Sequence, residues 1–450
     1  MLLMSIVCLS SFCATEALIV PPQALPVQFA GWEIIVGPGS VVLRGEPARK
    51  LSPAVKFTVA PPEKIPVRGE KFDVLPEYNE KTSAGWARGA RPACIITQEC
   101  TATGALIPES LVLRPAADEK AAPFVLDKDY KVDPLWGTFG RMQGGAITET
   151  TAVLVDYDYY PERLDSIAID AAGRARLVPG TPGVGSILPP ALAPGEKAVV
   201  SIFVKGGTTK LDNESVFPIQ TPTPRITYKD APAEKLLPKT LAKLRAGEKV
   251  VIVAFGDSVT CGGGVDGKTE LFYQNHFAAE LQKRFPKAQV EMRTAGWGGA
   301  GSKQYMEAPK GGEHDYIRDL IDPHPDLVTI EFVNDAYLDE AGVAPHYGKI
   351  LADLRGAGAE VVFITPHLVR PDWLKSDTLK VDADPRPYVS GLINFALREN
   401  VAVADASREW CTLWRQGLPY VTLLANSINH PDERGHVIFV NALMGLFPEK

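Results

Sequence analysis

The sequence predicts two domains of different class, an all-β, sandwich-like domain followed by an α/β domain built on a doubly wound parallel sheet. Short β-branched and aromatic runs, separated by proline and glycine, fill the chain up to about residue 220. Beyond about residue 245 the pattern changes, and apolar runs alternate with amphipathic stretches. A chain of 450 residues is also too long for one ordinary domain.

The expected β domain comprises residues 20–220. Its strand-like runs are GWEIIVGPGSVVL, TAVLVDYDYY, LDSIAID and KAVVSIFVK. Runs of this length with turn residues between them are typical of a β-sandwich or a related all-β module. Residues 221–245 are rich in Pro, Thr and Lys, and this composition predicts a linker between the domains.

The expected α/β domain comprises residues 246–450. Its strand-like runs are KVVIVAF, QVEMRTAG, DLVTIEFV, EVVFITPH and VAVAD, and its helical stretches include LFYQNHFAAELQKRF, HYGKILADLRGAG and ERGHVIFVNALMGLF. Nearly continuous apolar strands separated by amphipathic helices indicate a parallel sheet that is covered on both faces. Sheets of this kind place their chemistry at the carboxyl ends of the strands.

The first 19 residues resemble a secretory signal peptide, since an apolar stretch is followed by small residues. The stretch lacks the basic residue that usually precedes it, so a buried N-terminal segment is the alternative. We expect a secreted or periplasmic protein. Cys94 and Cys100 could close a short disulfide loop in such a compartment, or remain free thiols.

Composition excludes several classes of function. The net charge of −7 is spread along the chain without a Lys/Arg-rich tract, so nucleic acid is not an expected partner. No apolar run approaches the roughly 20 residues that a membrane span requires. No CxxC or HExxH spacing is present, and we expect neither a metal nor an organic cofactor.

Four polar or glycine-rich blocks follow the expected strands. The first strand ends in GDSVT, which presents Ser258 on a tight turn, although a serine here could also cap a helix. The second ends in AGWGGAGS, whose glycines allow a backbone N–H to approach a ligand closely. The third ends in EFVNDA with Asn334, and near the C-terminus His430 directly precedes a proline.

Taken together, and in this order, the four blocks resemble those of the SGNH/GDSL hydrolases over about residues 245–448. The resemblance implies a flavodoxin-like three-layer fold and a serine esterase. It implies Ser258 as nucleophile and His430 as general base. It also implies an oxyanion hole formed by the N–H groups of Ser258 and Gly299, with Gly296 as the alternative, and by the amide of Asn334.

The chain departs from the family pattern at two places. Phe332 replaces a glycine in the third block, and Ser427 occupies the position of the acid three residues before the histidine. An ionised carboxylate there would orient the imidazole and stabilise its protonated form. Asn426, Ser427, a backbone carbonyl or Asp432 could orient the imidazole in place of this acid, or no group does so. We therefore expect a dyad or an amide-supported triad.

The expected reaction is acyl transfer to water from a small-molecule or polysaccharide ester. A β-rich companion domain and Trp297, whose ring could stack on a sugar or fill a domain interface, favour O-acetyl groups on a carbohydrate. His367 is a possible substrate contact, with a structural role as the alternative. Other hypotheses are a lipase or lysophospholipase, an O-acetyltransferase, and a carbohydrate-binding protein on a weakened hydrolase scaffold. The oligomeric state stays open.

Overall fold

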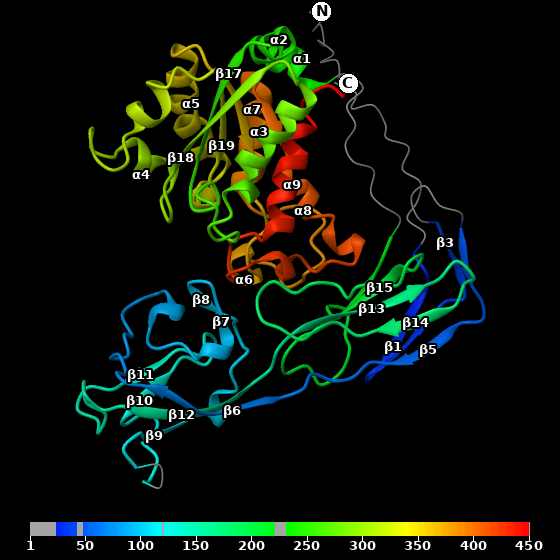
Figure 1. Ribbon diagram of the computed structural model, residues 1–450, viewed down its shortest axis with the longest axis vertical. Coiled ribbons are helices and arrows are strands. Elements are labelled where there is room, and N and C mark those ends of the chain that lie inside the picture. The colour runs from blue at the N-terminus through cyan, green and yellow to red at the C-terminus, as the bar shows by residue number, and fades with distance from the viewer. Residues whose placement is uncertain (1–23, 43–47, 119–120, 221–230, 450) are drawn as a thin grey trace, which may run out of the picture.

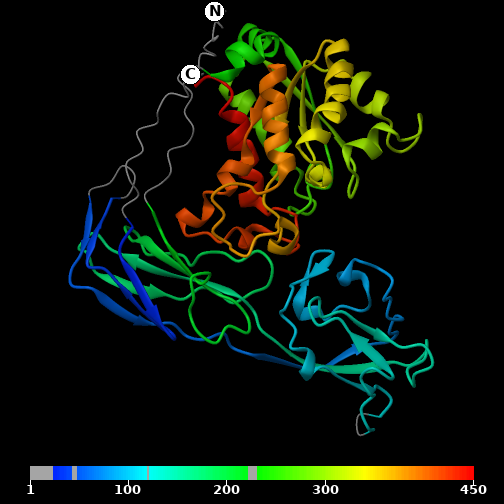
Figure 2. The ribbon, with the colours of Figure 1, turned by 180° about the vertical axis from the view of Figure 1, so that it is seen from behind.

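The computed structural model describes residues 24–42, 48–118, 121–220 and 231–449 (Figure 1). The expected signal peptide, residues 1–19, lies outside the described residues, as do residues 221–230 of the expected linker. The α/β domain forms one end of the molecule, and two β-rich units lie against its lower edge (Figure 1, Figure 2).

The α/β domain contains a five-stranded parallel sheet with the order β18-β17-β19-β20-β21. The strands are β17 (Lys249–Gly256), β18 (Gln289–Gly296), β19 (Leu327–Glu331), β20 (Glu360–Ile364) and β21 (Ala402–Ala404). Numbered within the domain, this order is 2-1-3-4-5, the flavodoxin-like arrangement. The predicted fold class of this domain is confirmed.

Helices cover both faces of the sheet because alternate strand residues point to opposite sides. Val250 and Ile252 of β17 belong to one hydrophobic cluster, and Val253 and Phe255 belong to the other. The first face is covered by α1 (Pro232–Leu236), α2 (Pro238–Ala246), α3 (Tyr273–Arg284), α8 (Ala406–Trp410) and α9 (Glu433–Met444). The second is covered by α5 (Glu340–Gly356) and α7 (Pro387–Glu399).

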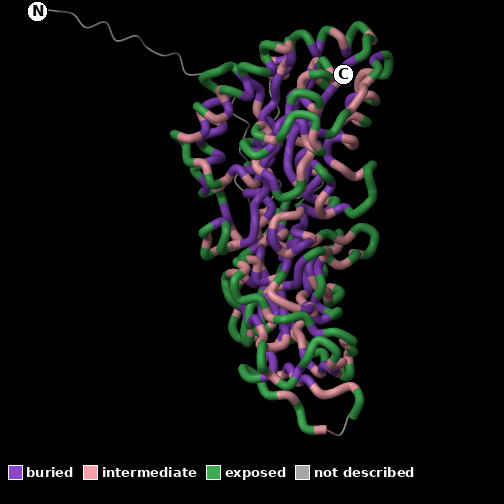
Figure 3. The backbone as a smooth tube through the Cα atoms, turned by 90° about the vertical axis from the view of Figure 1, so that its left-hand side faces the viewer, coloured by how far each residue is buried: buried purple, intermediate pink, exposed green. Residues whose placement is uncertain are grey.

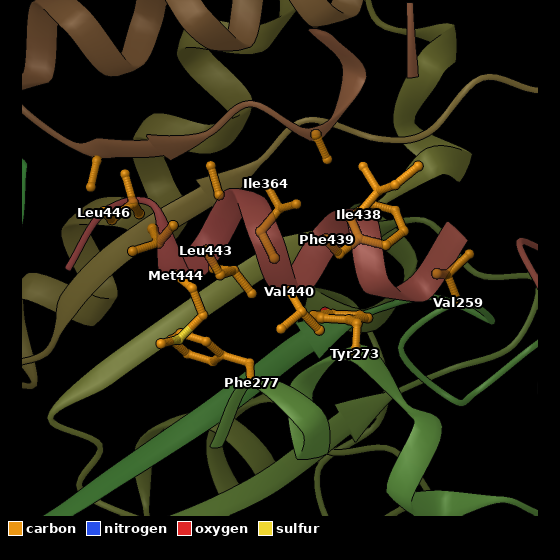
Figure 4. Packing of buried hydrophobic residues seen from close by; sticks show 14 of the residues in the cluster. Val259, Tyr273, Phe277, Ile364, Ile438, Phe439, Val440, Leu443, Met444 and Leu446 are labelled. Carbon is orange, nitrogen blue, oxygen red and sulfur yellow. The ribbon is translucent and has the colours of Figure 1, made fainter. Parts of the chain in front are cut away.

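The packing of α9 fixes the last helix relative to the sheet. Phe439, Val440 and Leu443 lie among the side chains of Tyr273 and Phe277 from α3 (Figure 4). Shorter elements complete the domain: η4 (Thr269–Leu271), α4 (Ser302–Met306), the π-helix η5 (Ile317–Ile321), η6 (Val333–Tyr337), α6 (Pro371–Leu374), η7 (Leu413–Gln416) and η8 (Tyr420–Leu423). In the described part of the chain, no helix has the length and apolar character needed to cross a membrane.

The first β-rich unit is built from two antiparallel sheets. One contains β1 (Val27–Ala30), β2 (Glu33–Val36) and β5 (Val55–Thr58); the other contains β13 (Arg163–Ile169), β14 (Ala175–Val178), β15 (Lys197–Val204) and β16 (Val216–Pro218). The short strands β3 (Gly39–Val41) and β4 (Arg49–Leu51) pair with each other. One hydrophobic cluster joins Ile34 and Val36 to Ile167 and Ile202, so the two sheets share a core.

Residues 65–159, which we call the insert module, form the second β-rich unit between β5 and β13. Its strands are β6 (Ile65–Phe72), β7 (Ile96–Thr97), β8 (Cys100–Thr101), β9 (Val112–Pro115), β10 (Tyr130–Val132), β11 (Phe139–Arg141) and β12 (Val153–Tyr159). Three single 3₁₀ turns are η1 (Gly85–Ala87), η2 (Ala93–Ile95) and η3 (Pro108–Ser110). The module has its own hydrophobic cluster, including Leu113, Phe139 and Val155. The predicted all-β character of the N-terminal half is confirmed.

Both β-rich units contact the α/β domain. From the first unit, Phe217 and Ile187 belong to a cluster that includes Leu418. From the insert module, Trp136 packs with Ile428. Figure 3 shows buried backbone running through the interior of the molecule while exposed segments lie at its edges. The apolar contacts between the units therefore hold the loops at the lower edge of the α/β domain.

Candidate active site

The nucleophile turn follows β17. Asp257 is fully buried, and its carboxylate accepts hydrogen bonds from the N–H groups of Val259, at 3.1 Å, and Asn334, at 3.0 Å. Burial raises the pKa of Asp257 to about 7, although these two N–H groups act in the opposite direction. The carboxyl group thereby ties the turn after β17 to the turn after β19. Ser258 follows it and remains partly exposed.

His430 lies beside this serine. The distance between His430 Nε2 and Ser258 Oγ is 3.1 Å, which is a hydrogen bond. The structure therefore brings together the two residues predicted as nucleophile and base, from loops 172 positions apart. Such a contact is what a base needs in order to accept the proton of the attacking hydroxyl.

Two buried side chains hold the loop before His430 in place. Asn426 is 1% exposed, and its Oδ1 accepts from the N–H groups of Ile428, Asn429 and His430, each at 2.9 Å. His367 is fully buried, and its Nε2 donates to the carbonyl of Asn429 at 2.6 Å. The structure thus gives His367 a supporting place behind the loop and keeps it away from solvent.

A close backbone approach allows this loop to reach the nucleophile turn. At Gly264 the backbone has φ +99°, and a Cβ atom would lie 1.9 Å from the carbonyl oxygen of Pro431. At the neighbouring Gly263 a Cβ atom would lie 3.0 Å from the ring of His430. Residues with side chains would force the two loops apart at these positions.

Gly299 and Asn334, two of the predicted oxyanion donors, belong to loops that lie next to the nucleophile turn. A Cβ atom on Gly298 would lie 3.9 Å from the Cβ of Ser258, so the glycine-rich loop passes close to the nucleophile. Gly299 follows with φ +78°, and its surroundings are open. The Nδ2 of Asn334 donates to the carbonyl of Ala300 at 3.2 Å, which leaves its second hydrogen for a ligand.

Two cavities meet at Asn334. The first, of about 690 Å³, is bordered by Trp297, Gly299 and Tyr337. The second, of about 460 Å³, is bordered by Trp373. The Trp297 ring stacks on His314 with 4.2 Å between the centroids, so its orientation is fixed. A substrate therefore has space in two cavities that Asn334, the proposed oxyanion donor, borders.

The electrostatic environment keeps His430 suited to act as a base. Burial lowers the pKa of His430, while the carboxylates of Glu99 and Asp266 act to raise it. The net direction is downward, so the ring is neutral at pH 7 and Nε2 can accept a proton. Another histidine, His436, lies in the core: its Nδ1 accepts from the N–H of Tyr273 and its Nε2 lies 3.1 Å from the carbonyl of Gly263. Its pKa is lowered to about 4 by burial.

The other ring nitrogen of His430 faces the insert module. Its Nδ1 lies 3.3 Å from Oε1 of Glu99 and 3.4 Å from Oε1 of Gln98. Neither residue was predicted from the sequence, because both precede the histidine by more than 300 positions and belong to no recognisable motif. Only the packing of the insert module against the α/β domain reveals them.

The residues predicted to orient the His430 ring make other contacts in the structure. Asp432 caps α9 by accepting from the N–H groups of Arg434, at 3.0 Å, and Gly435, at 3.2 Å. Ser427 takes a left-handed backbone conformation, with φ +60°. Asn426 acts on the loop backbone, and its Nδ2 donates to Glu99 Oε1 at 2.9 Å.

Among the described residues, no cluster of His, Cys, Asp and Glu side chains could hold a metal ion.

A serine and a histidine in contact at the carboxyl edge of a doubly wound sheet can carry out acyl transfer from a carboxylic ester. Residues 254–438 match the model of the GDSL-like lipase/acylhydrolase family. The resemblance seen in the four sequence blocks is confirmed over this part of the chain. A comparison with curated proteins finds no match.

Several solved structures are similar to parts of the chain. One is a two-domain esterase active on acetylated mannans, with 22% identity, coverage of 46% of this chain and 51% of that one, and a TM-score of 0.37. The acetyl xylan esterase AlAXEase has 20% identity, 43% and 98% coverage, and a TM-score of 0.34. Axe2 from Geobacillus stearothermophilus, an acetylxylan esterase, has 19% identity, 46% and 97% coverage, and a TM-score of 0.35. This chain spans about half the length of the mannan esterase.

Proposed function

We propose that the protein is a secreted serine esterase that removes O-acetyl groups from a carbohydrate, with Ser258 as nucleophile and His430 as general base. The observation that supports this most directly is the 3.1 Å contact between Ser258 Oγ and His430 Nε2. The apolar segment at the start of the chain supports export.

In the first half of the reaction, Ser258 Oγ attacks the acetyl carbonyl carbon while His430 Nε2 takes the hydroxyl proton. The negative charge on the carbonyl oxygen is stabilised by the N–H groups of Ser258 and Gly299 and by the amide of Asn334. Loss of one such donor typically lowers the rate by about 10²- to 10³-fold. The tetrahedral intermediate collapses, the bond to the sugar oxygen breaks, and that oxygen receives the proton from His430.

In the second half, water attacks the acetyl group on Ser258 and gives its proton to His430. Collapse of this intermediate breaks the bond to Ser258 Oγ, which recovers the proton, and acetate leaves. The residues need no metal or organic cofactor for either half.

The surroundings of the site support a carbohydrate ester. Tyr337 is 64% exposed and Trp373 is 47% exposed, and each borders one of the two cavities that meet at Asn334. Exposed aromatic rings beside a polar site provide flat apolar faces on which sugar rings can lie. The two cavities that Asn334 borders suit a substrate that extends beyond the acetyl group.

The test is hydrolysis of p-nitrophenyl acetate and of an acetylated polysaccharide by the purified protein and by its Ser258→Ala and His430→Ala variants. Because the two residues act as a unit, each variant should lose at least about 10³-fold in kcat. Ser390→Ala is the matched control, since Ser390 is exposed on α7. Activity that survives Ser258→Ala would reject the assignment, and inactivity of the unmutated protein on both esters would favour a carbohydrate-binding role.

A further inference from the structure

We propose that Glu99 of the insert module is the positioning residue for His430 and replaces the acid that the sequence lacks before this histidine. This inference rests on the proposed function, and it makes the esterase site a joint product of two parts of the chain. The α/β domain supplies the nucleophile, the base and the oxyanion donors, and the insert module supplies the carboxylate.

The carboxylate is presented by the tip of a short hairpin. β7 and β8 pair antiparallel, with Thr97 opposite Cys100, so Gln98 and Glu99 form a two-residue turn. Gln98 has φ +54°, a conformation that residues other than glycine, asparagine and aspartate seldom adopt. Arg91 donates through Nη1 to the backbone carbonyl of Glu99 and supports the turn. Backbone conformations of this kind persist where surrounding contacts enforce them, often at functional sites.

Apolar contacts hold the hairpin against the histidine loop. Cys100 of β8 is 1% exposed and belongs to a small cluster with Trp136 and Ile428, which lies two residues before His430. The guanidinium of Arg370 lies over the Trp136 ring, 4.6 Å from its centroid. The turn therefore belongs to a packed interface, and the β7–β8 hairpin lies beside the lower edge of the α/β domain (Figure 1).

Polar contacts then fix the carboxylate itself. Glu99 Oε1 lies 3.3 Å from His430 Nδ1 and accepts from Asn426 Nδ2 at 2.9 Å. The neighbouring Gln98 is anchored by its amide, which donates to Asp266 Oδ2 at 3.1 Å. Asn426 thus links the two loops, because its oxygen binds the histidine loop and its nitrogen binds Glu99.

This geometry favours the imidazole tautomer that carries its proton on Nδ1. With Nδ1 protonated, donating to Gln98 Oε1 and facing the Glu99 carboxylate at 3.3 Å, the lone pair lies on Nε2, which faces Ser258. When Nε2 takes the proton of the serine, the nearby negative charge stabilises the imidazolium. Gln98 Oε1 accepts at 3.4 Å but is neutral, so the charge that stabilises the imidazolium comes from the Glu99 carboxylate. Asp432 is engaged by the backbone of α9 and by Arg434.

The charges around His430 give the inference a pH signature. Glu99 and Asp266 are the acidic groups that raise its pKa, against the larger effect of burial. The two nearby histidines, His367 and His436, are themselves buried, and burial lowers the pKa of both. Removing the charge of Glu99 should therefore lower the pKa of His430 and move the acidic limb of kcat/KM to lower pH.

The first experiment compares the unmutated protein with its Glu99→Gln, Glu99→Ala and Glu99→Asp variants on p-nitrophenyl acetate across pH. Because the carboxylate is half exposed and 3.3 Å away, we expect kcat to fall by about 10- to 100-fold in Glu99→Gln and Glu99→Ala, less than the loss for a buried triad acid, with KM little changed. Glu99→Asp should recover part of the rate. Glu109→Gln is the matched control, since Glu109 is an exposed glutamate of the same module, and it should retain the unmutated rate and pH profile.

The second experiment follows the imidazole of His430 by nuclear magnetic resonance during a pH titration, with the signal assigned by a His430→Asn variant. A downward shift of its pKa in Glu99→Gln, absent in Glu109→Gln, supports the inference even if no tested ester is hydrolysed. An unchanged pKa, or an active Glu99→Gln variant with the unmutated kcat and pH profile, overturns it. Loss of activity in Ser258→Ala tests the proposed function separately, so the two failures are distinguishable.

Discussion

At the scale of single residues, the two ring nitrogens of His430 have different surroundings. Nε2 faces a neutral hydroxyl at 3.1 Å, and Nδ1 faces an amide oxygen and a carboxylate at 3.3 to 3.4 Å. The ring itself is 14% exposed. Burial disfavours the charged imidazolium, and the acidic groups offset only part of this effect. The resting histidine is therefore a neutral base that becomes charged only during the reaction.

This balance predicts the sign of the pH dependence. Protonated His430 cannot accept the serine proton, so kcat/KM should fall as the pH drops through the pKa of the free enzyme. Because that pKa lies below the ordinary value for histidine, activity should persist to a lower pH than an unperturbed histidine would allow. The measurement is a pH–rate profile with p-nitrophenyl acetate. An acidic limb centred above about pH 6.5, the ordinary histidine value, would contradict the prediction.

The residues of the site differ in how far the sequence predicts them. Ser258 and His430 lie in local motifs at strand ends, and the structure places them in contact. Glu99 lies in a hairpin turn 327 positions before Asn426, the side chain that binds it. No local pattern marks a turn glutamate as an active-site group. Its role depends on long-range packing, which a single sequence does not record.

At the scale of elements, the strands and most of the long helices of the α/β domain follow from periodicity, and the long helix that does not has a physical reason. The apolar run KVVIVAF became β17, and the run ERGHVIFVNALMGLF contains α9. Helix α7 was not predicted. It begins with Pro387, follows a long irregular segment and contains Gly391 together with β-branched residues, which weaken a helical pattern. Glycine is suited to position 391 because the backbone of Glu340 passes close by: a Cβ atom at this position would lie 2.7 Å from the Cα of Glu340.

The loop after the nucleophile gives a prediction at this scale. In Gly264→Ala the new methyl group would meet the carbonyl of Pro431 at 1.9 Å, so the histidine loop must move away from Ser258. We expect kcat to fall at least about 10-fold, because small displacements of a catalytic group are costly. The measurement is kcat together with the free energy of unfolding in urea.

Gly267→Ala is the control for this prediction. Gly267 also has a positive φ, +69°, but no atom lies within 4 Å of its Cβ position. The Gly267→Ala variant should lose about 1 kcal/mol of folding stability, the cost of a positive φ for alanine, and should keep its kcat. Equal losses of kcat in the two variants would mean that the close approach at Gly264 does not hold the loop in place.

At the scale of the whole molecule, the contact between the insert module and the α/β domain couples stability to catalysis. Trp136 is 7% exposed and packs with Cys100 and Ile428, which lie next to Glu99 and near His430 respectively. The same interface that buries apolar surface therefore sets the position of the carboxylate. The sequence predicts a β-rich N-terminal half, but short strand patterns do not state which loops of one domain touch another.

Trp136→Ala tests this coupling. Removing the ring should destabilise the protein by about 3 to 5 kcal/mol at most and loosen the hairpin that carries Glu99. We expect a lower kcat and an acidic limb of kcat/KM shifted in the same direction as in Glu99→Gln. Trp32→Ala is the matched control, because Trp32 is partly buried against the core of the first β-rich unit, in a cluster that contains no active-site residue. It should lose stability without moving the pH profile.

A double variant separates the two effects of Trp136. If the ring acts on catalysis through Glu99, Trp136→Ala introduced into Glu99→Gln should lower stability again but should leave kcat and the pH profile nearly as they are in Glu99→Gln alone. Effects that pass through one shared group are not additive, whereas independent effects are. Multiplied losses of kcat in the double variant would show that the interface supports the nucleophile turn or the oxyanion donors by a route that does not involve the carboxylate.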